Sequence, residues 1–349
     1  MSNELKDLRV SNDAMDDPAE LQRRIADEGY LFFKRLVSPD KLWELRREMM
    51  SMIQQVGWLV AGTDPMAGIA DINMRYTEGD NEYSAGYAEV YKIENFHRSA
   101  HWHEYLDIVE KMVGAPIMPH PQKVARIWFP KYTEHTTPKH QDFVHFQGSF
   151  ENITCWAPIG DCPIELGGLA VIPGSHKVNR VLEHHFSLGA GGLIVDETEH
   201  DEIDPVWHSA DYEAGDALFF PALTIHQALP NYTEDKLRLS LDNRYMLVGD
   251  KIAGHMLEPH GPSQLAWDDI YPGWQRDDLK YYWKDYNNPV VERDLSFSQK
   301  SFAQAIDLAR GGDEHAVYAL QRAVKNAKDR VDLNEAIAVL EELGVAVEY

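Results

Sequence analysis

Near the middle of the chain stands Lys139-His140-Gln141-Asp142-Phe143, which places an imidazole and a carboxylate two residues apart. Side chains of an extended strand alternate between two faces, so His140 and Asp142 are expected to project to the same side. Together they would supply two of the three protein ligands of a facial metal site. A second histidine would complete that site and favour Fe(II), with the remaining coordination positions open.

The third ligand is expected further along the chain, in Pro221-Ala-Leu-Thr-Ile-His226-Gln-Ala-Leu, where His226 ends an apolar run. Just beyond it, Leu237-Arg238-Leu239-Ser240-Leu241 alternates, so Arg238 and Ser240 share one face of a predicted strand. A guanidinium beside a hydroxyl suits the distal carboxylate of a dicarboxylic co-substrate. An HxD triplet alone is weak evidence, but HxD, a distant histidine and RxS in this order are far more specific.

The intervening segment carries a family resemblance. It contains Trp156-Ala-Pro-Ile-Gly-Asp161 and Gly167-Gly168-Leu169-Ala-Val-Ile-Pro-Gly174-Ser175-His176-Lys177, and Asp27-Glu28-Gly29-Tyr30-Leu31-Phe32-Phe33 stands near the N-terminus. These motifs resemble those of the phytanoyl-CoA dioxygenase family, whose members are Fe(II)- and 2-oxoglutarate-dependent oxygenases. The resemblance spans roughly residues 18–250 and leaves the C-terminal hundred residues uncovered.

The resemblance implies a specific chemistry. His140, Asp142 and His226 would hold Fe(II), and 2-oxoglutarate and O2 would take the open positions. Oxidative decarboxylation to succinate and CO2 would drive hydroxylation of a substrate. The related halogenases have a small residue in place of the aspartate, so the presence of Asp142 favours hydroxylation. Desaturation, cyclisation or epimerisation by the same iron chemistry is an alternative, and so is a non-catalytic jelly-roll protein that binds a metal or small ligand.

The resemblance also suggests residues for 2-oxoglutarate. Arg238 would pair with its C5 carboxylate, helped by Ser240; the alternative is a buried structural arginine with a carboxylate partner. Thr154, on the strand that follows Asp142, would contact the co-substrate, unless it is an ordinary β-branched strand residue. Further along, Asp242 and Arg244 would neutralise each other, because an unpaired buried charge is costly.

Several side chains are expected to line the substrate pocket. Arg126 and Trp128 alternate on a strand, where the arginine would suit a substrate carboxylate or phosphate; the alternative is an arginine that snorkels beside a core tryptophan. His145 and Phe146 would form the pocket rim, and Trp156 would lie on the inward face. This mixture favours a compact polar or zwitterionic substrate. His145 lies three residues from Asp142, so on a strand it would face away and not bind the metal.

The composition, 44% hydrophobic and 26% charged over 349 residues, is that of a globular protein with a substantial core. The net charge is 33 − 57 = −24, which argues against a nucleic-acid or anionic-membrane partner. Cys155 and Cys162 are too few for a disulfide scaffold. Residues 1–7 contain no apolar signal core, and no apolar run approaches about 18 residues. We therefore expect a cytoplasmic protein with a small-molecule substrate.

Hydrophobic patterning predicts helices over 17–29 and 38–56, and then short strands punctuated by turns. The strand candidates are 123–129, 150–158, 168–172, 216–220, 224–228 and 237–247. Such spacing is typical of a sandwich or closed jelly roll. We therefore expect a mainly β fold with flanking helices: a double-stranded β-helix (cupin-like) oxygenase domain over residues 1–290, followed by a helical extension over 291–349.

Three further segments are expected to shape the pocket. Residues 57–95 lack clear periodicity and are expected to form a functional loop or lid. The insertion 176–212 could cover the mouth of the barrel. The extension 291–349 is expected to pack on the core or on a second subunit, which would make a homo-oligomer.

Overall fold

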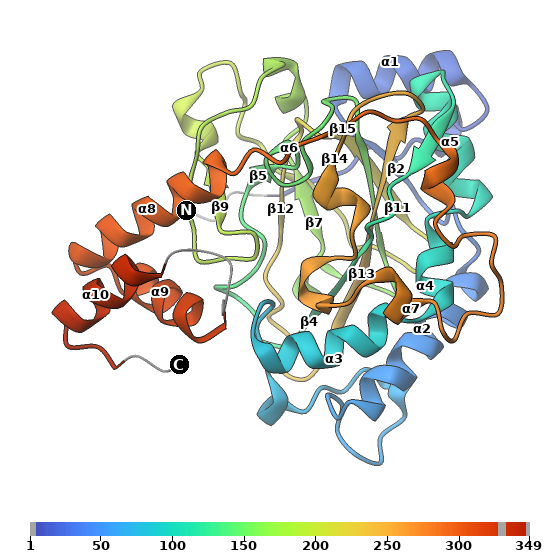
Figure 1. Ribbon diagram of the computed structural model, residues 1–349. Coiled ribbons are helices and arrows are strands. Elements are labelled where there is room, and N and C mark those ends of the chain that lie inside the picture. The colour runs from blue at the N-terminus through green and yellow to red at the C-terminus, as the bar shows by residue number, and fades with distance from the viewer. Residues whose placement is uncertain (1–4, 327–332, 347–349) are drawn as a thin grey trace.

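The computed structural model describes residues 5–326 and 333–346. Two β-sheets lie at the centre of the molecule, and helices surround them (Figure 1). The first sheet has the strand order β1 (Lys6–Asp7), β10 (His208–Ser209), β7 (Leu169–Val171), β12 (Ile225–Ala228) and β5 (His140–Gln141). The second has the order β2 (Leu31–Phe33), β11 (Ala217–Pro221), β6 (Ile153–Pro158), β13 (Arg238–Leu247) and β3 (Ile117–Pro119), with β4 (Val124–Trp128) also paired to β13.

Helices make up about 39% of the chain and strands about 19%, so the expected mainly β class is not confirmed. The architecture is one of mixed sheets with flanking helices. The α-helices are α1 (Pro18–Glu28), α2 (Pro39–Gln55), α3 (Asn81–Tyr91), α4 (Glu94–Ser99), α5 (His103–Val113), α6 (Phe143–Phe146), α7 (Trp267–Ile270), α8 (Ser296–Arg310), α9 (Glu314–Asn326) and α10 (Asn334–Glu342). None of the helices in the described part of the chain has the length and apolar character needed to cross a membrane.

Strand β6 shows how alternation creates two cores. Ile153, Cys155 and Ala157 belong to the hydrophobic cluster that α1 and α5 complete on the outer face of the second sheet. Trp156, on the opposite face, packs in a different cluster with Leu169 of the first sheet. Because neighbouring strand residues point to opposite faces, the inward side chains of both sheets meet in one interior space.

The two predicted N-terminal helices are confirmed as α1 and α2. The side chain of Asp17 caps α1 by accepting a hydrogen bond of 3.1 Å from the backbone N–H of Glu20. Gly29 ends α1 at φ 71°, and a Cβ there would lie 2.2 Å from Nδ1 of His176. The close approach of His176 therefore requires glycine at this helix end.

Residues 57–95 are not a loop throughout, because they contain α3. Its buried tyrosines, Tyr83, Tyr87 and Tyr91, recur every four residues and stack on one another along one face of the helix. Trp58 stacks on Tyr83 at 5.4 Å, and its ring lies where a side chain at Gly86 would be. This aromatic stripe fixes α3 against the rest of the core.

The insertion 176–212 mostly covers the outer face of the first sheet. Leu182, Val195 and Trp207 pack there with Ile225 of β12. Within the insertion, β8 (His184–Phe186) and β9 (Leu193–Val195) form a two-stranded antiparallel hairpin that the sequence did not predict.

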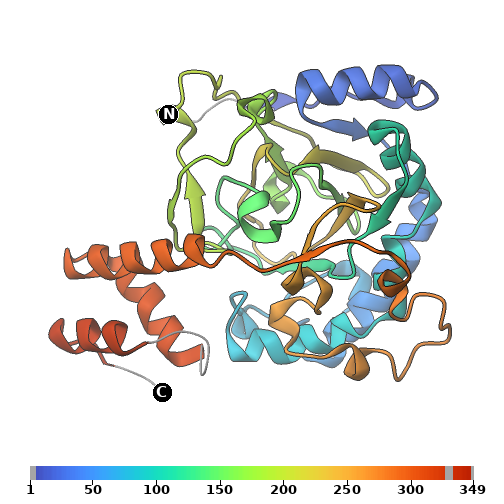
Figure 2. The same ribbon diagram turned by 45° about the horizontal axis from the view of Figure 1, so that its top comes forward.

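The C-terminal helices α8, α9 and α10 form a separate small core and extend to one side of the sheets (Figure 2). They attach to the hairpin β8–β9, where the Ser301 hydroxyl donates to the carbonyl of Gly192 at 2.7 Å and Gln304 accepts from the N–H of Phe186 at 2.8 Å. The extension therefore packs on its own chain. Residues 327–332 and 347–349 of the expected 291–349 segment lie outside the described residues.

Candidate metal centre

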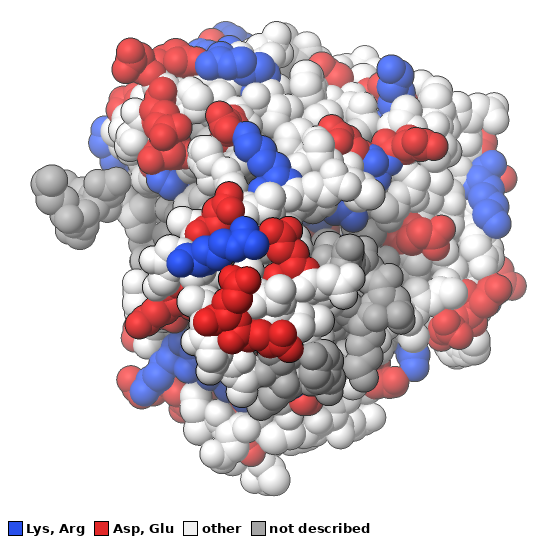
Figure 3. Space-filling view, turned by 60° about the vertical axis from the view of Figure 1, so that its left-hand side comes forward, with Lys and Arg blue, Asp and Glu red and all other residues white. Residues whose placement is uncertain are grey.

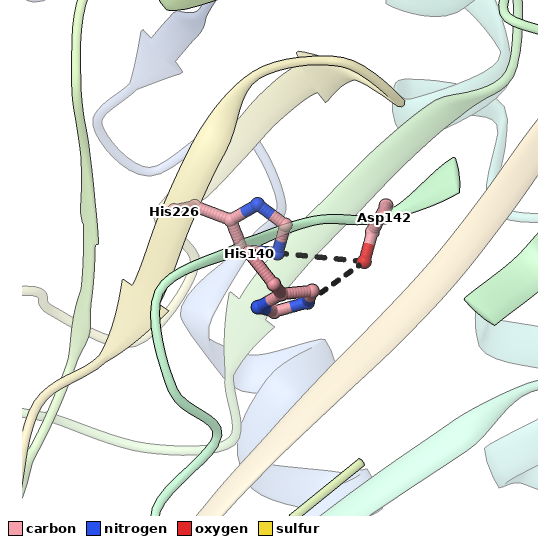
Figure 4. A group of neighbouring side chains, drawn as sticks. All are labelled: His140, Asp142 and His226. Carbon is pink, nitrogen blue, oxygen red and sulfur yellow. Dashed lines mark hydrogen bonds and ion pairs between the residues drawn. The ribbon is translucent and has the colours of Figure 1, made fainter. Parts of the chain in front are cut away.

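Three buried side chains point toward one another in the space between the sheets (Figure 4). One ligand atom each from His140, Asp142 and His226 lies within 4.8 Å of the other two. Oδ1 of Asp142 is 3.3 Å from Nε2 of His140 and 3.4 Å from Nε2 of His226. Two imidazole nitrogens and one carboxylate oxygen thus converge on one point, a donor set that fits Fe(II).

Paired strands and a chain reversal produce this convergence. His140 on β5 and His226 on β12 are direct cross-strand partners. Asp142 does not continue the strand, because its backbone is helical (φ −59°, ψ −28°) and it is the N-cap residue directly before α6. The sequence predicted that His140 and Asp142 meet, but the geometry is a strand end that turns into a helix rather than period-2 alternation.

The backbone orients both imidazoles. Nδ1 of His140 lies 2.7 Å from the carbonyl of Pro138, and Nδ1 of His226 lies 3.0 Å from the carbonyl of Thr224. A carbonyl can only accept, so each Nδ1 carries the proton and each Nε2 presents a lone pair to the centre. Burial also lowers the pKa of His140, with His226 adding to the effect, which favours the neutral ligand form.

The two oxygens of Asp142 have different neighbours. Oδ2 accepts a hydrogen bond of 2.5 Å from the Thr154 hydroxyl and lies 3.8 Å from Nη2 of Arg244, while Oδ1 faces the imidazoles. Burial alone would raise the pKa of Asp142, but neighbouring His226 and Arg244 outweigh it and hold the pKa well below its usual range. The carboxylate is therefore ionised and presents a single free oxygen.

Arg238 is buried without an ionic partner. Its Nε donates to the carbonyl of Gly167 at 2.9 Å, and its guanidinium lies 4.1 Å from the ring centroid of Trp128 and 5.5 Å from that of Trp156. Nη1 has no hydrogen-bond partner, and no ion pair involves Arg238, among the residues that the structure describes. A fully buried cation of this kind is ready to receive an anionic group.

Arg126, in contrast, is already paired. Nη1 of Arg126 lies 2.7 Å from both carboxylate oxygens of Glu78, and its Nε donates to Asp242 at 3.1 Å. Asp242 in turn lies 3.7 Å from Nη2 of Arg244. The expected Asp242–Arg244 pair thus exists, but as part of a network of alternating charges that ends at Asp142.

The other expected site residues surround the same space. Thr154, Trp128 and Trp156 line the cavity beside the three metal-site residues. Ser240 is fully buried on β13, and its hydroxyl has no partner in the described ranges. Phe146 packs under the guanidinium of Arg244, 3.6 Å from ring centroid to Cζ.

His145 lies closer to the centre than a strand would have placed it. It is on α6, and its ring centroid is 5.1 Å from that of His140. It does not belong to the group of ligand atoms that His140, Asp142 and His226 form.

Sequence reasoning missed Glu78, which lies in a stretch without periodicity, and the role of Arg244, whose contact with Asp142 depends on the long-range pairing of strands.

Comparison with known proteins agrees with this geometry. The model of the phytanoyl-CoA dioxygenase family matches residues 25–239. The chain belongs to this family. Family members require Fe(II) and 2-oxoglutarate, and the converging histidine and carboxylate groups supply the expected metal-binding site.

Individual proteins share less than a quarter of their aligned residues with this chain. Two curated proteins named 1-deoxypentalenic acid 11-beta-hydroxylase, from Streptomyces exfoliatus and Streptomyces arenae, are each 24% identical, over 70% of this chain and 86% of their own. The epimerase SnoN, solved with Fe3+, alpha ketoglutarate and nogalamycin RO, is 21% identical, covers 79% of this chain and 98% of its own, and has a TM-score of 0.48. The carbocyclase SnoK is 19% identical, covers 67% and 85%, and has a TM-score of 0.47.

Proposed function

We propose that His140, Asp142 and His226 hold the Fe(II) of a 2-oxoglutarate-dependent hydroxylase that acts on a small organic substrate. The observation that carries this proposal is the convergence of two Nε2 atoms and one carboxylate oxygen within 4.8 Å in a buried site. Bound there with 2-oxoglutarate and O2, iron would supply an oxidant strong enough to remove hydrogen from an unactivated C–H bond. The names of the two curated relatives support hydroxylation as the outcome.

Arg238 would bind the distal carboxylate of 2-oxoglutarate. Its buried, unpaired Nη1 offers a charge-assisted hydrogen bond, and the orphaned hydroxyl of Ser240 is two residues along the same strand face. Trp128 and Trp156 would keep the guanidinium in place and exclude water from the pair. Thr154 would act through Asp142, whose Oδ2 it already binds, rather than through the co-substrate alone.

The proposal also divides the chain into an oxygenase domain and a helical extension. The two facing sheets would form a double-stranded β-helix within residues 1–290, and 291–349 would be a helical extension, which the separate core of α8–α10 supports. The face of that extension turned away from the barrel could join a second copy. Cys155 and Cys162 are both free thiols, as expected in a reducing cytoplasm.

Succinate release tests the proposed function. The purified chain with Fe(II), 2-oxoglutarate and O2 should release succinate slowly without substrate, and Asp142→Ala should abolish that release. Asp307→Ala, at an exposed position on α8, is the control and should retain it. Unchanged succinate release by Asp142→Ala would refute the assignment. The mass of the product separates hydroxylation, which adds one oxygen, from desaturation or cyclisation, which removes two hydrogens, and from epimerisation, which preserves mass.

A further inference from the structure

A large chamber lies between the C-terminal helices, the β8–β9 hairpin, α3 and residues 258–265, outside the cavity of the metal centre. Its volume is about 1020 Å3, compared with about 30 Å3 for the cavity beside His140, Asp142 and His226. An organic molecule of drug-like size fits a cavity of the larger volume. Of these two spaces, only the chamber has room for a substrate of that size.

The helical extension provides one wall of this chamber. Phe302 and Ala305 of α8 and Ala319 and Ala323 of α9 line it. Ion pairs and hydrogen bonds fix the wall in place: Arg322 of α9 binds the Asp80 carboxylate at 2.9 Å and the carbonyl of Glu78 at 3.0 Å. The family match ends at residue 239, so these helices are a feature of this chain beyond the matched region.

The chamber approaches the metal centre at two points, across an ion pair at one and across a single ring at the other. Glu78 lines the chamber and binds Arg126, which lines the metal cavity. Gly191 also lines the chamber, and a Cβ at Gly191 would lie 2.8 Å from the ring of His145, which itself meets the ring of His140 edge to face. A molecule held in the chamber therefore lies one side-chain layer from the metal-binding group.

The charges of the chamber restrict what it can bind. Arg322 is the sole lysine or arginine among the described lining residues, and it is committed to Asp80. Glu258 adds a carboxylate to the lining, and Glu78 adds another that is already paired with Arg126. Acidic side chains are also prominent on the face that carries the C-terminal helices (Figure 3). An anion would meet this acidic lining without a free cation, which is unfavourable.

The rest of the lining mixes small and apolar residues with uncharged polar ones such as Asn81, Gln264 and Asn326. The residues 189–192, Ala319 and Ala323 are small, whereas Phe186, Leu265 and Phe302 offer apolar surface. We propose that this chamber binds the substrate of the iron centre, and that the substrate is an organic molecule with apolar surface that is uncharged or carries an amine. This inference rests on the proposed function, and it gives the C-terminal extension a role in substrate binding.

Binding of the uncharged dye Nile red to the full-length protein tests the site. Ala323→Trp would fill the chamber from α9 and should weaken dye binding at least ten-fold. His315→Trp places the same indole on an exposed position of α9 outside the chamber and should bind the dye as the wild type does. Ala319→Trp is a second filling variant in case Ala323→Trp does not fold. Wild-type dye affinity in a folded filling variant would overturn the proposal.

Competition tests the charge preference. Naphthalenemethanol and naphthylmethylamine should each displace Nile red at concentrations at least ten-fold below that needed for naphthoic acid. Preferential displacement by the acid, or displacement by none of the three, would contradict the inferred substrate class. Succinate release without substrate keeps the two claims distinguishable, because it reports on the iron centre, and His315→Trp, outside the chamber, should retain it. No succinate release by the wild type would refute the proposed function. Succinate release by the wild type, together with unchanged dye binding in a folded filling variant, would refute only the chamber.

Discussion

The hydroxyl of Thr154 determines which oxygen of Asp142 is free. It donates to Oδ2 at 2.5 Å and leaves Oδ1 to face the imidazoles. Partners of this kind orient a ligand and typically change metal affinity by about 10–100-fold. Thr154→Val keeps the shape and removes the donor, so we expect the Fe(II) dissociation constant, measured anaerobically by calorimetry, to rise at least ten-fold. Thr137→Val, in the same cavity, is the control and should stay within about two-fold.

Unchanged affinity of Thr154→Val would show that Asp142 needs no support from β6. The alternative support is Arg244, which lies 3.8 Å from the same oxygen.

Arg238 gives a prediction that separates the co-substrate from the metal. Replacing it with methionine removes the buried cation that would meet the distal carboxylate, and truncating one partner of such a pair costs about 2–5 kcal/mol. Arg238→Met should therefore weaken 2-oxoglutarate binding about 30-fold or more while leaving Fe(II) affinity unchanged. Arg276→Met, at an exposed position, is the control. The 2-oxoglutarate affinity is measured by anaerobic titration. An affinity of Arg238→Met equal to that of the wild type would show that Arg238 does not bind 2-oxoglutarate.

At the scale of elements, Ser175 fixes the start of the strand that carries His226. Its hydroxyl donates to the carbonyl of Ile172 at 2.7 Å and accepts from the N–H of Ile225 at 2.9 Å. Ser175→Ala would leave that buried N–H without a partner, which costs about 1–3 kcal/mol. We expect the free energy of unfolding, measured by urea titration, to fall by this amount, whereas exposed Thr198→Ala should change it little. A stability loss below about 0.5 kcal/mol would contradict this role.

The strands could be predicted from sequence because each has a clean pattern. β4, β6, β7, β11, β12 and β13 all fall within the predicted ranges to within one residue. Helix α3 was not predicted, because the segment around it is rich in glycine, aspartate and asparagine. The four-residue spacing of its tyrosines was therefore not recognised as a helical pattern. Local alternation is visible in one segment of sequence, whereas the aromatic packing of Trp58 on α3 depends on the folded chain.

The metal site likewise has residues that the sequence predicted and contacts that only the fold shows. His140, Asp142, His226 and Arg238 could be predicted from motif order and are found together in one cavity. The partner of Arg126 could not be predicted, because Glu78 lies 48 residues earlier in a stretch without a recognisable pattern. Free arginines and paired arginines look alike in sequence, and only the fold shows that, of the three arginines that line the metal cavity, Arg238 alone has no ion pair with a described residue.

For the molecule as a whole, buried histidines make stability depend on pH. His97 is fully buried, with Nε2 2.6 Å from the carbonyl of Tyr91, and burial, with a contribution from Lys123, lowers its pKa to about 3. Between pH 6.5 and 3 the unfolded chain binds a proton that the folded chain does not. The free energy of unfolding must therefore fall as the pH falls through this window, by about 2 kcal/mol for this group between pH 7 and 5.

His97→Phe keeps an aromatic ring in the same aromatic surroundings and removes the titrating group. We expect the difference in unfolding free energy between pH 7 and 5, measured by urea titration, to be about 2 kcal/mol smaller than in the wild type. His103→Phe, on an exposed side chain, should leave the pH dependence unchanged. The same pH dependence in His97→Phe and wild type would show that His97 is not the group responsible.

The most direct test of the account is the iron stoichiometry of the purified chain under anaerobic conditions. With 2-oxoglutarate present, equilibrium dialysis against Fe(II) should give one tightly bound iron per wild-type chain, and His226→Ala should lose that iron even though the 226 position is 86 residues from His140. His103→Ala, an exposed histidine, should bind one iron like the wild type. One iron per chain with unchanged affinity in His226→Ala would contradict a centre built from β5, α6 and β12.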